Sequence, residues 1–194
     1  MKKVLALMQA LVMALSLSAC GGEGKKTEAD NTASAESGGE AGGDAEVIKI
    51  GLCQPFTGQN AVAGEYSRYG VELAVEEINN AGGFEVGGKM YTIEIVEEDN
   101  EGKPEITNNA YNKLIGQDEV KAIIGPDASG PLISAGPLAT AAKIPAIGTT
   151  ASNPDCTTVG GEYVFRACWI DSFQAVVCAR MASEILGATK AAVL

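Results

Sequence analysis

Histidine is absent from all 194 residues of the sequence. The commonest general base and metal ligand of proteins is therefore missing, and no Ser-His-Asp or Cys-His mechanism can be assembled from these residues. The five cysteines include no pair at C-x2-C spacing, which disfavours a zinc site. We expect no metal, no cofactor and a role other than catalysis.

Basic residues are also scarce. Fourteen Lys and Arg stand against 25 Asp and Glu, which gives a formal net charge of −11. A surface this acidic repels phosphate and favours solubility, so a nucleic-acid partner is not expected. With 46% hydrophobic residues the chain can bury a core, and its length predicts one domain, or one and a piece of another.

Residues 1–20 have the pattern of an export signal. Lys2 and Lys3 precede an apolar run over 4–19 that is short for a membrane span. The run ends in Leu17-Ser18-Ala19-Cys20, which resembles a lipobox, so we predict a lipoprotein signal peptide with lipidation at Cys20. Acyl chains there would hold the protein on the membrane outside the cytoplasm. The alternative is an ordinary signal peptide in which Cys20 has no role.

Residues 21–46 are dominated by Gly, Ser, Ala, Glu, Asp and Lys and contain no aromatic residue. Such a segment cannot bury enough apolar surface to offset the entropy lost on ordering. We therefore predict a disordered linker over 21–46.

From residue 47 onward, strand and helix patterns alternate. Apolar or alternating runs predict strands at 47–53, 90–96, 120–124, 144–147, 163–166 and 191–194. Helical spacing predicts helices at 62–80, from Pro104 onward, at 129–142 and at 173–186. The alternation predicts an α/β fold, a parallel sheet flanked by helices. In such sheets ligands bind beyond the carboxyl ends of the strands.

The first predicted helix has an apolar face at helical spacing. Tyr66, Tyr69, Gly70, Leu73, Ala74 and Ile78 share that face, and Glu72, Glu76 and Glu77 lie elsewhere. We expect the apolar face to be buried and the glutamates to contact water.

Two loops at strand ends carry small polar residues: Gly125–Gly130 and Gly148–Pro154. Ser129 is a suitable N-cap residue, and the free amides of a helix start favour an anion such as a carboxylate. Asp127 would instead favour a cation, or cap the helix itself. The alternative is that both loops are ordinary capped turns, in which these residue types are common.

The sequence from residue 47 onward resembles the leucine/isoleucine/valine-binding proteins, which have the type I periplasmic-binding fold. The resemblance is carried, in order, by IKIGLCQPFTG at 48–58, GVELAVEEINNAGG at 70–83, Asp99, AIIGPDASG at 122–130, IPAIGTTASNP at 144–154 and FRACWIDSFQ at 165–174. It implies that residues 47–167 form the first lobe of a two-lobe protein. Residues 168–194 would be the crossover and the start of a second lobe, the rest of which lies outside this sequence.

The resemblance also implies where a ligand would bind. The family holds an amino acid by its α-carboxylate and α-ammonium, and the matching positions here are Ser129, Thr150, Ala151 and Ser152. Trp169, beside the crossover, either lines the cleft or packs at the hinge. Ala63 stands where some leucine binders carry an aromatic residue, so the resemblance does not predict which side chain the ligand carries.

The implied function is capture of a small amino acid for uptake by an ABC transporter, whose permease subunits would be the protein partners. The alternatives are a sensor ectodomain of the same fold, or an extracellular hydrolase using Ser129 or Ser152. Cys156 and Cys168 are close enough in sequence to form a disulfide outside the cytoplasm, and buried free thiols are the alternative.

Overall fold

The computed structural model describes residues 45–192. The predicted lipidation site at Cys20 and the predicted linker, apart from its last two residues, lie outside this range. Glu46 already belongs to the first strand, so the folded part begins one residue earlier than expected. No helix within residues 45–192 combines the length and the apolar character needed to cross a membrane.

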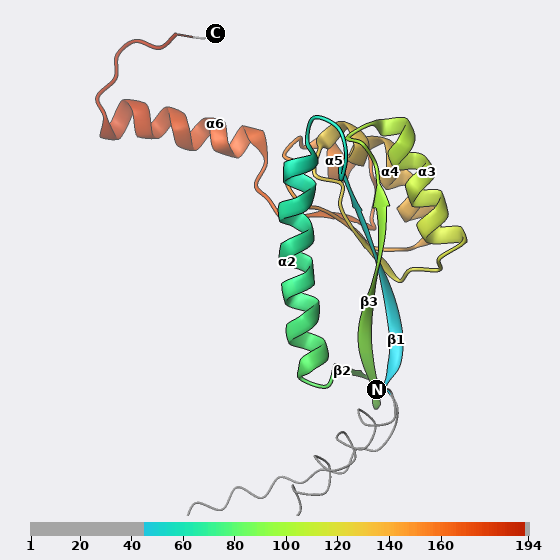
Figure 1. Ribbon diagram of the computed structural model, residues 1–194. Coiled ribbons are helices and arrows are strands. Elements are labelled where there is room, and N and C mark those ends of the chain that lie inside the picture. The colour runs from blue at the N-terminus through green and yellow to red at the C-terminus, as the bar shows by residue number, and fades with distance from the viewer. Residues whose placement is uncertain (1–44, 193–194) are drawn as a thin grey trace, which may run out of the picture. The chain divides into compact units, whose positions relative to one another are not determined.

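Six strands form one sheet in the order β2-β3-β1-β4-β5-β6 (Figure 1). Their bounds are β1 Glu46–Gln54, β2 Phe84–Val86, β3 Lys89–Asp99, β4 Ala122–Ile124, β5 Ala146–Gly148 and β6 Val164–Arg166. All neighbouring pairs are parallel except β2 and β3, which form an antiparallel hairpin. The prediction of an α/β fold with a mostly parallel sheet is confirmed. The short edge strand β2 was not predicted.

The helices are α2 Ala61–Asn80, α3 Pro104–Gly116, α4 Ser129–Ala142, α5 Asp155–Thr158 and α6 Asp171–Arg180, with a π-helical turn at Met181–Ile185. The chain steps from β1 to β3 in one direction, then back across β1 to β4. Right-handed crossovers therefore put α2 and α3 on opposite faces of the sheet, as Figure 1 shows. The point where the direction reverses lies between β1 and β4, and ligands of open α/β sheets bind there.

The core lies between the sheet and the α3–α4 pair. Tyr111, Leu114 and Ile123 are fully buried there, together with alanines of α4. The hydroxyl of Tyr111 donates to the carbonyl oxygen of Gly125 at 2.7 Å. This bond ties the core of the lobe to the loop that follows β4.

The prediction for the buried face of α2 is wrong for all of its residues but Ile78, which is half-buried. Tyr66, Tyr69 and Leu73 are 70, 57 and 60% exposed, whereas Val71 and Val75 are half-buried. The register of the helix is fixed by polar contacts: the side-chain amide of Asn79 donates to Ile93 O at 2.9 Å and accepts from Ile93 N at 2.8 Å. The helix has apolar residues on two sides, and periodicity alone does not tell which side is covered.

The end of the chain differs from the prediction in two ways. The predicted helix at 173–186 is α6 followed by the π-helical turn, and no residue of α6 is buried. Residues 191 and 192 are not in a strand, and 193 and 194 lie outside the described range. The helix α6 is separated from β6 by residues 167–170.

Candidate ligand-binding site

Three hydrogen bonds join the loop after β4 to the loop after β5. Thr149 N donates to Pro126 O at 3.3 Å, Thr150 Oγ1 donates to Asp127 O at 2.9 Å, and Asn153 N donates to Ser129 Oγ at 3.2 Å. The structure therefore brings together the predicted residues Ser129, Thr150, Ala151 and Ser152. They lie beyond the carboxyl ends of β4 and β5, beside the point where the strand order reverses.

The hydroxyls of Ser129 and Thr150 are used in opposite senses. The Ser129 oxygen accepts from a backbone amide, so the hydroxyl proton is left to point toward another acceptor. The Thr150 hydroxyl donates its proton to a carbonyl, which leaves its oxygen lone pairs as acceptors. The pair can thus present one donor and one acceptor to a ligand.

In the loop after β5, Ala151 is fully buried and Ser152 is half-buried. The carbonyl oxygen of Ser152 accepts from Asp171 N at 3.0 Å. Among residues 45–192, no protein group forms a hydrogen bond with the Ser152 hydroxyl. That hydroxyl is therefore accessible to a ligand without breaking a bond within the protein.

The helix α4 begins at Ser129, and its N-cap is Ala128, which makes no side-chain cap. The expectation that Ser129 or Asp127 caps the helix is wrong, because Ser129 is the first helical residue and its oxygen is used by Asn153. Pro131 has no N–H, so the exposed amides of this helix start are those of Ser129 and Gly130. They favour an anion at the same place as the Ser129 hydroxyl.

Only glycine fits at position 125, where the chain turns from β4 into the loop. Its φ is +110°, and a Cβ atom there would lie 2.0 Å from Cys53 O. Asp127, two residues further on, is 8% exposed, and its Oδ1 has no hydrogen-bond partner among residues 45–192. Burial raises the pKa of Asp127, and the neighbouring amides of Ala128 and of Asp127 itself offset this only in part. Asp127 is therefore a poor partner for a ligand cation.

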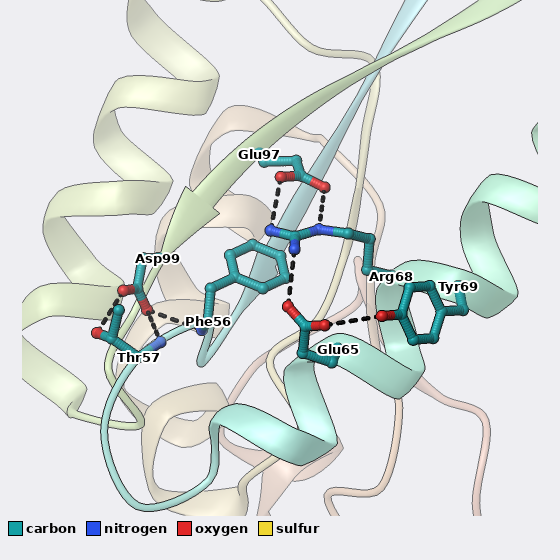
Figure 2. A network of polar contacts seen from close by, with 7 residues as sticks. All are labelled: Phe56, Thr57, Glu65, Arg68, Tyr69, Glu97 and Asp99. Atoms are coloured by element: carbon teal, nitrogen blue, oxygen red, sulfur yellow. Dashed lines mark hydrogen bonds and ion pairs between the residues drawn. The ribbon is translucent and has the colours of Figure 1, made fainter.

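The loop after β1 is held by the carboxylate of Asp99, at the end of β3 (Figure 2). Asp99 Oδ1 accepts from Phe56 N at 2.9 Å and from Thr57 N at 3.3 Å, and Asp99 Oδ2 accepts from Thr57 Oγ1 at 2.6 Å. Glu101 N donates to the same carboxylate at 2.9 Å. Burial by itself would raise the pKa of Asp99, but these four donors together hold that pKa below its ordinary value.

A second contact fixes the same loop through the side chain of Phe56. The Arg68 guanidinium lies 4.0 Å from the centre of the Phe56 ring, a cation–π geometry. Figure 2 shows this guanidinium held between Glu97, through bonds of 2.7 and 2.9 Å, and Glu65, at 3.0 Å. The first loop therefore has a defined shape beside the site, although it contributes no predicted ligand contact.

Trp169 is placed differently from the other predicted residues. Its side chain is 63% exposed and lines an apolar hollow with Phe173, Gln174, Val177 and Cys178 of α6 and its approach. The hollow belongs to the segment after β6. A contact of Trp169 with the ligand stays a prediction.

The cysteines of the described range are free thiols, so the structure has no disulfide between Cys156 and Cys168. Cys156 is buried, with its Sγ 3.8 Å from Ser129 O, and burial raises its pKa. Within residues 45–192, no group of three His, Cys, Asp or Glu side chains is placed to hold a metal ion.

Sequence reasoning missed the residues that shape the loops. Asp99 was noted only as part of the family resemblance, and Arg166, whose guanidinium contacts the loop that carries Ser152, was not singled out. The available signal was position: each of these charged residues is the last residue of a strand at the carboxyl edge of the sheet.

Comparisons with known proteins agree with this fold. Residues 47–194 match the family described as periplasmic binding protein. The chain is 35% identical over 133 residues to the Leu/Ile/Val-binding protein BraC3 of Rhizobium johnstonii, which covers 69% of this chain and 35% of that protein.

Two solved structures are similar. LivJ of Streptococcus pneumoniae, a branched-chain amino acid transporter substrate-binding protein in complex with isoleucine, has a TM-score of 0.65 and 35% identity over 73% of this chain and 39% of that one. A solute-binding protein of an ABC transporter from Rhodopseudomonas palustris, in complex with 3,4-dihydroxybenzoic acid, has a TM-score of 0.63 and 27% identity over 72% and 36%.

The chain thus spans between a third and two fifths of the length of these relatives. The family match takes in the whole sequence after residue 46, and with it every strand and helix of the structure apart from the first residue of β1. The chain belongs to the periplasmic binding protein family.

Proposed function

We propose that this chain provides one half of the binding site of an extracytoplasmic solute-binding protein that captures a small amino acid for uptake by an ABC transporter. The observation that carries the proposal is the opposite hydrogen-bond sense of Ser129 and Thr150. An α-amino acid needs both senses, because its carboxylate only accepts hydrogen bonds and its ammonium only donates them.

The carboxylate fits the donor side of the site. The Ser129 hydroxyl, the amides at the start of α4 and the Ser152 hydroxyl are all able to donate, and hydrogen bonds to a charged group are worth about 1.5–3 kcal/mol each. The net charge of −11 repels anions in general, so recognition of a carboxylate has to come from these local donors.

The ammonium fits the acceptor side. The Thr150 oxygen retains its lone pairs, and the Thr150 residue is exposed at the loop surface. Asp127 does not supply a counter-charge, since burial raises its pKa and its carboxylate is covered. In this proposal the acidic partner of the ammonium comes from outside residues 45–192.

The ligands of the two solved relatives define the alternative. Isoleucine and 3,4-dihydroxybenzoic acid both carry a carboxylate, but only isoleucine carries an ammonium. The donor side alone would suit either ligand. The acceptor on Thr150 favours the amino acid.

The proposal includes a location and partners. Cys20 would be lipidated after export, so that the protein is anchored on the outer side of the cytoplasmic membrane by acyl chains. The permease subunits of the transporter would receive the ligand. No catalytic step is proposed, because no residue of this chain can act as the histidine base of a serine hydrolase.

Calorimetric titration tests the proposed function. It uses the full-length protein, meaning this chain together with the other half of the proposed site, produced without the predicted signal peptide at residues 1–20. We expect micromolar dissociation constants, about −8 kcal/mol, for one or more small amino acids and much weaker binding of benzoic acids. Heat with hydroxybenzoic acids but with none of the amino acids would assign the site to aromatic acids instead. The absence of heat with both classes would reject the proposal.

A further inference from the structure

Arg166, the last residue of β6, holds the loop that carries Ser152. Its Nη1 donates to Asn153 O at 2.8 Å and to Ala151 O at 3.4 Å, and its Nη2 donates to Pro154 O at 3.0 Å and to Thr157 Oγ1 at 2.8 Å. One side chain therefore bonds to three carbonyl oxygens of the loop backbone and to a threonine of the short helix α5.

The four bonds use all the protons of the two Nη atoms. A guanidinium has five N–H groups, so only the Nε–H is left. Arg166 thus has no pair of parallel donors with which to bind a ligand carboxylate. Its charge is directed to neutral carbonyls of its own chain, which is the geometry of a positioning residue.

The carbonyls on either side of Ser152 point to Arg166, whereas the carbonyl of Ser152 itself points the other way. It accepts from Asp171 N, the first amide of α6, at 3.0 Å. The peptide groups around Ser152 are therefore fixed from two directions. Both restraints come from one stretch of chain, which runs from the end of β6 to the start of α6.

We propose that Arg166 and the backbone amide of Asp171 position Ser152 for ligand binding, so that the affinity of the site depends on the segment between β6 and α6. This inference rests on the proposed function. Because Ser152 and the start of α6 share a hydrogen bond, a movement of α6 relative to the sheet changes the loop, and a ligand bound to the loop restrains α6.

The first test replaces Arg166 in the full-length protein. The probes are L-isoleucine and, after it, the amino acid that binds most tightly in the calorimetric series. Arg166→Gln removes the charge and most of the donors, and we expect the dissociation constant to rise at least tenfold. Arg166→Lys keeps the charge but loses the planar fork, and we expect a smaller rise, of about three- to tenfold. Partial rescue by lysine follows from the retained contact to one or two carbonyls.

Asn79→Ala is the matched control for a loss of stability. It removes two hydrogen bonds to Ile93 near the end of α2, far along the sheet from the loops. We expect a similar drop in melting temperature with a dissociation constant within twofold of the wild type. The proposal is overturned if Arg166→Gln binds within twofold of the wild type, or if Asn79→Ala weakens binding as much.

The second test removes a single backbone proton. Asp171 is the first residue of α6, where proline is tolerated, and Ile170 has φ −87° and ψ 151°, which suits a residue before proline. Asp171→Pro deletes the amide that bonds to Ser152 O, and Asp171→Ala loses the same carboxylate but keeps the amide. We expect the proline variant to bind at least threefold more weakly than the alanine variant, and equal affinities would contradict the coupling.

Hydrogen exchange of the Asn153 amide separates this inference from the proposed function. That amide bonds to Ser129 Oγ, so its protection reports whether the loop keeps its shape. We expect faster exchange in Arg166→Gln and unchanged exchange in Asn79→Ala, with or without ligand. If no amino acid binds the wild type, the proposed function fails, and the exchange rates still decide whether Arg166 holds the loop.

Discussion

The backbone amide of Asn153 donates to the hydroxyl oxygen of Ser129 at 3.2 Å, and this bond crosses between the two loops that end β4 and β5. It makes Ser129 part of the framework as well as part of the candidate site. Ser152, one residue away from Asn153, forms no such bond through its hydroxyl within residues 45–192. The two serines therefore have separable roles.

Replacing each serine with alanine should reveal this difference. Ser152→Ala should weaken amino acid binding about tenfold or more, because one bond to a charged group is lost, and should leave the free energy of unfolding nearly unchanged. Ser129→Ala should weaken binding and also lower the free energy of unfolding by about 1 kcal/mol, because the Asn153 amide loses its acceptor. Calorimetry and urea denaturation measure the two effects.

Ser134→Ala is the control for both variants. Ser134 lies in the same helix as Ser129, and its hydroxyl exchanges hydrogen bonds with Asn108 on the α3 side. We expect a loss of stability without a loss of affinity. Weaker binding in Ser134→Ala, or full affinity in Ser152→Ala, would place the ligand elsewhere.

The lipid anchor is tested at Cys20. The sequence Leu17-Ser18-Ala19-Cys20 predicts acylation of the thiol, and several acyl chains bind a membrane firmly at about 0.8 kcal/mol per buried CH2 group. Cys20→Ser should release the protein from membranes and abolish the incorporation of labelled fatty acid. Ser18→Thr, which leaves the cysteine in place, is the control. A serine variant that stays membrane-bound and labelled would reject lipidation at this position.

Two leucines distinguish the buried from the exposed apolar surface. Leu114, a residue of α3, is fully buried, and Leu114→Ala should lower the free energy of unfolding by about 2–5 kcal/mol. Leu73, on the outer face of α2, is 60% exposed, and Leu73→Ala should change the free energy of unfolding by no more than about 0.5 kcal/mol. Denaturant titration compares the two. Equal costs would mean that the outer face of α2 is covered in solution.

The same helix shows what the sequence could and could not predict. The bounds of α2 and α4 and the start of α3 followed from periodicity, the glycines after α2 and Pro104, all of which are local signals. The covered face of α2 depended on which of two apolar stripes meets the sheet, and that is decided by contacts distant in sequence, such as Asn79 with Ile93.

The candidate site divides in a similar way. The proximity of Ser129 and Ser152 could be predicted from the sequence, because both follow strands that end at the same edge of a parallel sheet. The roles of Asp99 and Arg166 could not, because each depends on the directions of several backbone amides or carbonyls in loops without regular structure. The edge strand β2 was missed because three residues are too few to show a period.

The clamp made by Asp99 gives a stability that depends on pH in the acid range. The folded state lowers the pKa of Asp99, so the carboxylate contributes stability above the unfolded value of about 4, and this contribution is lost as the pH falls through the folded pKa. Asp99→Asn should therefore be less stable than the wild type at pH 7, by about 1–3 kcal/mol. The difference should shrink as the pH falls below 4. Urea denaturation at pH 7 and pH 3 measures it, and a constant difference would contradict the assignment.

Asp127 should behave in the opposite way. Burial raises its pKa, so the folded state holds the proton more tightly than the unfolded state. Its stabilising contribution is complete below the unfolded pKa of about 4 and is lost as the pH rises through the folded pKa. Above the folded pKa the protein carries a covered carboxylate whose Oδ1 has no partner among residues 45–192.

Asp127→Asn removes that charge at every pH while keeping nearly the same shape. We expect the variant to be more stable than the wild type at pH 7, by about 1 kcal/mol, and to lose this advantage at pH 3, where the wild-type carboxyl is protonated. Denaturation of both proteins at a series of pH values from 3 to 7 gives the difference directly, and contributions from Asp99 cancel because both proteins share them. If the variant is less stable at pH 7, the covered carboxylate must have a partner that compensates its burial, and the assignment of Asp127 as an acid whose burial is only partly offset is wrong.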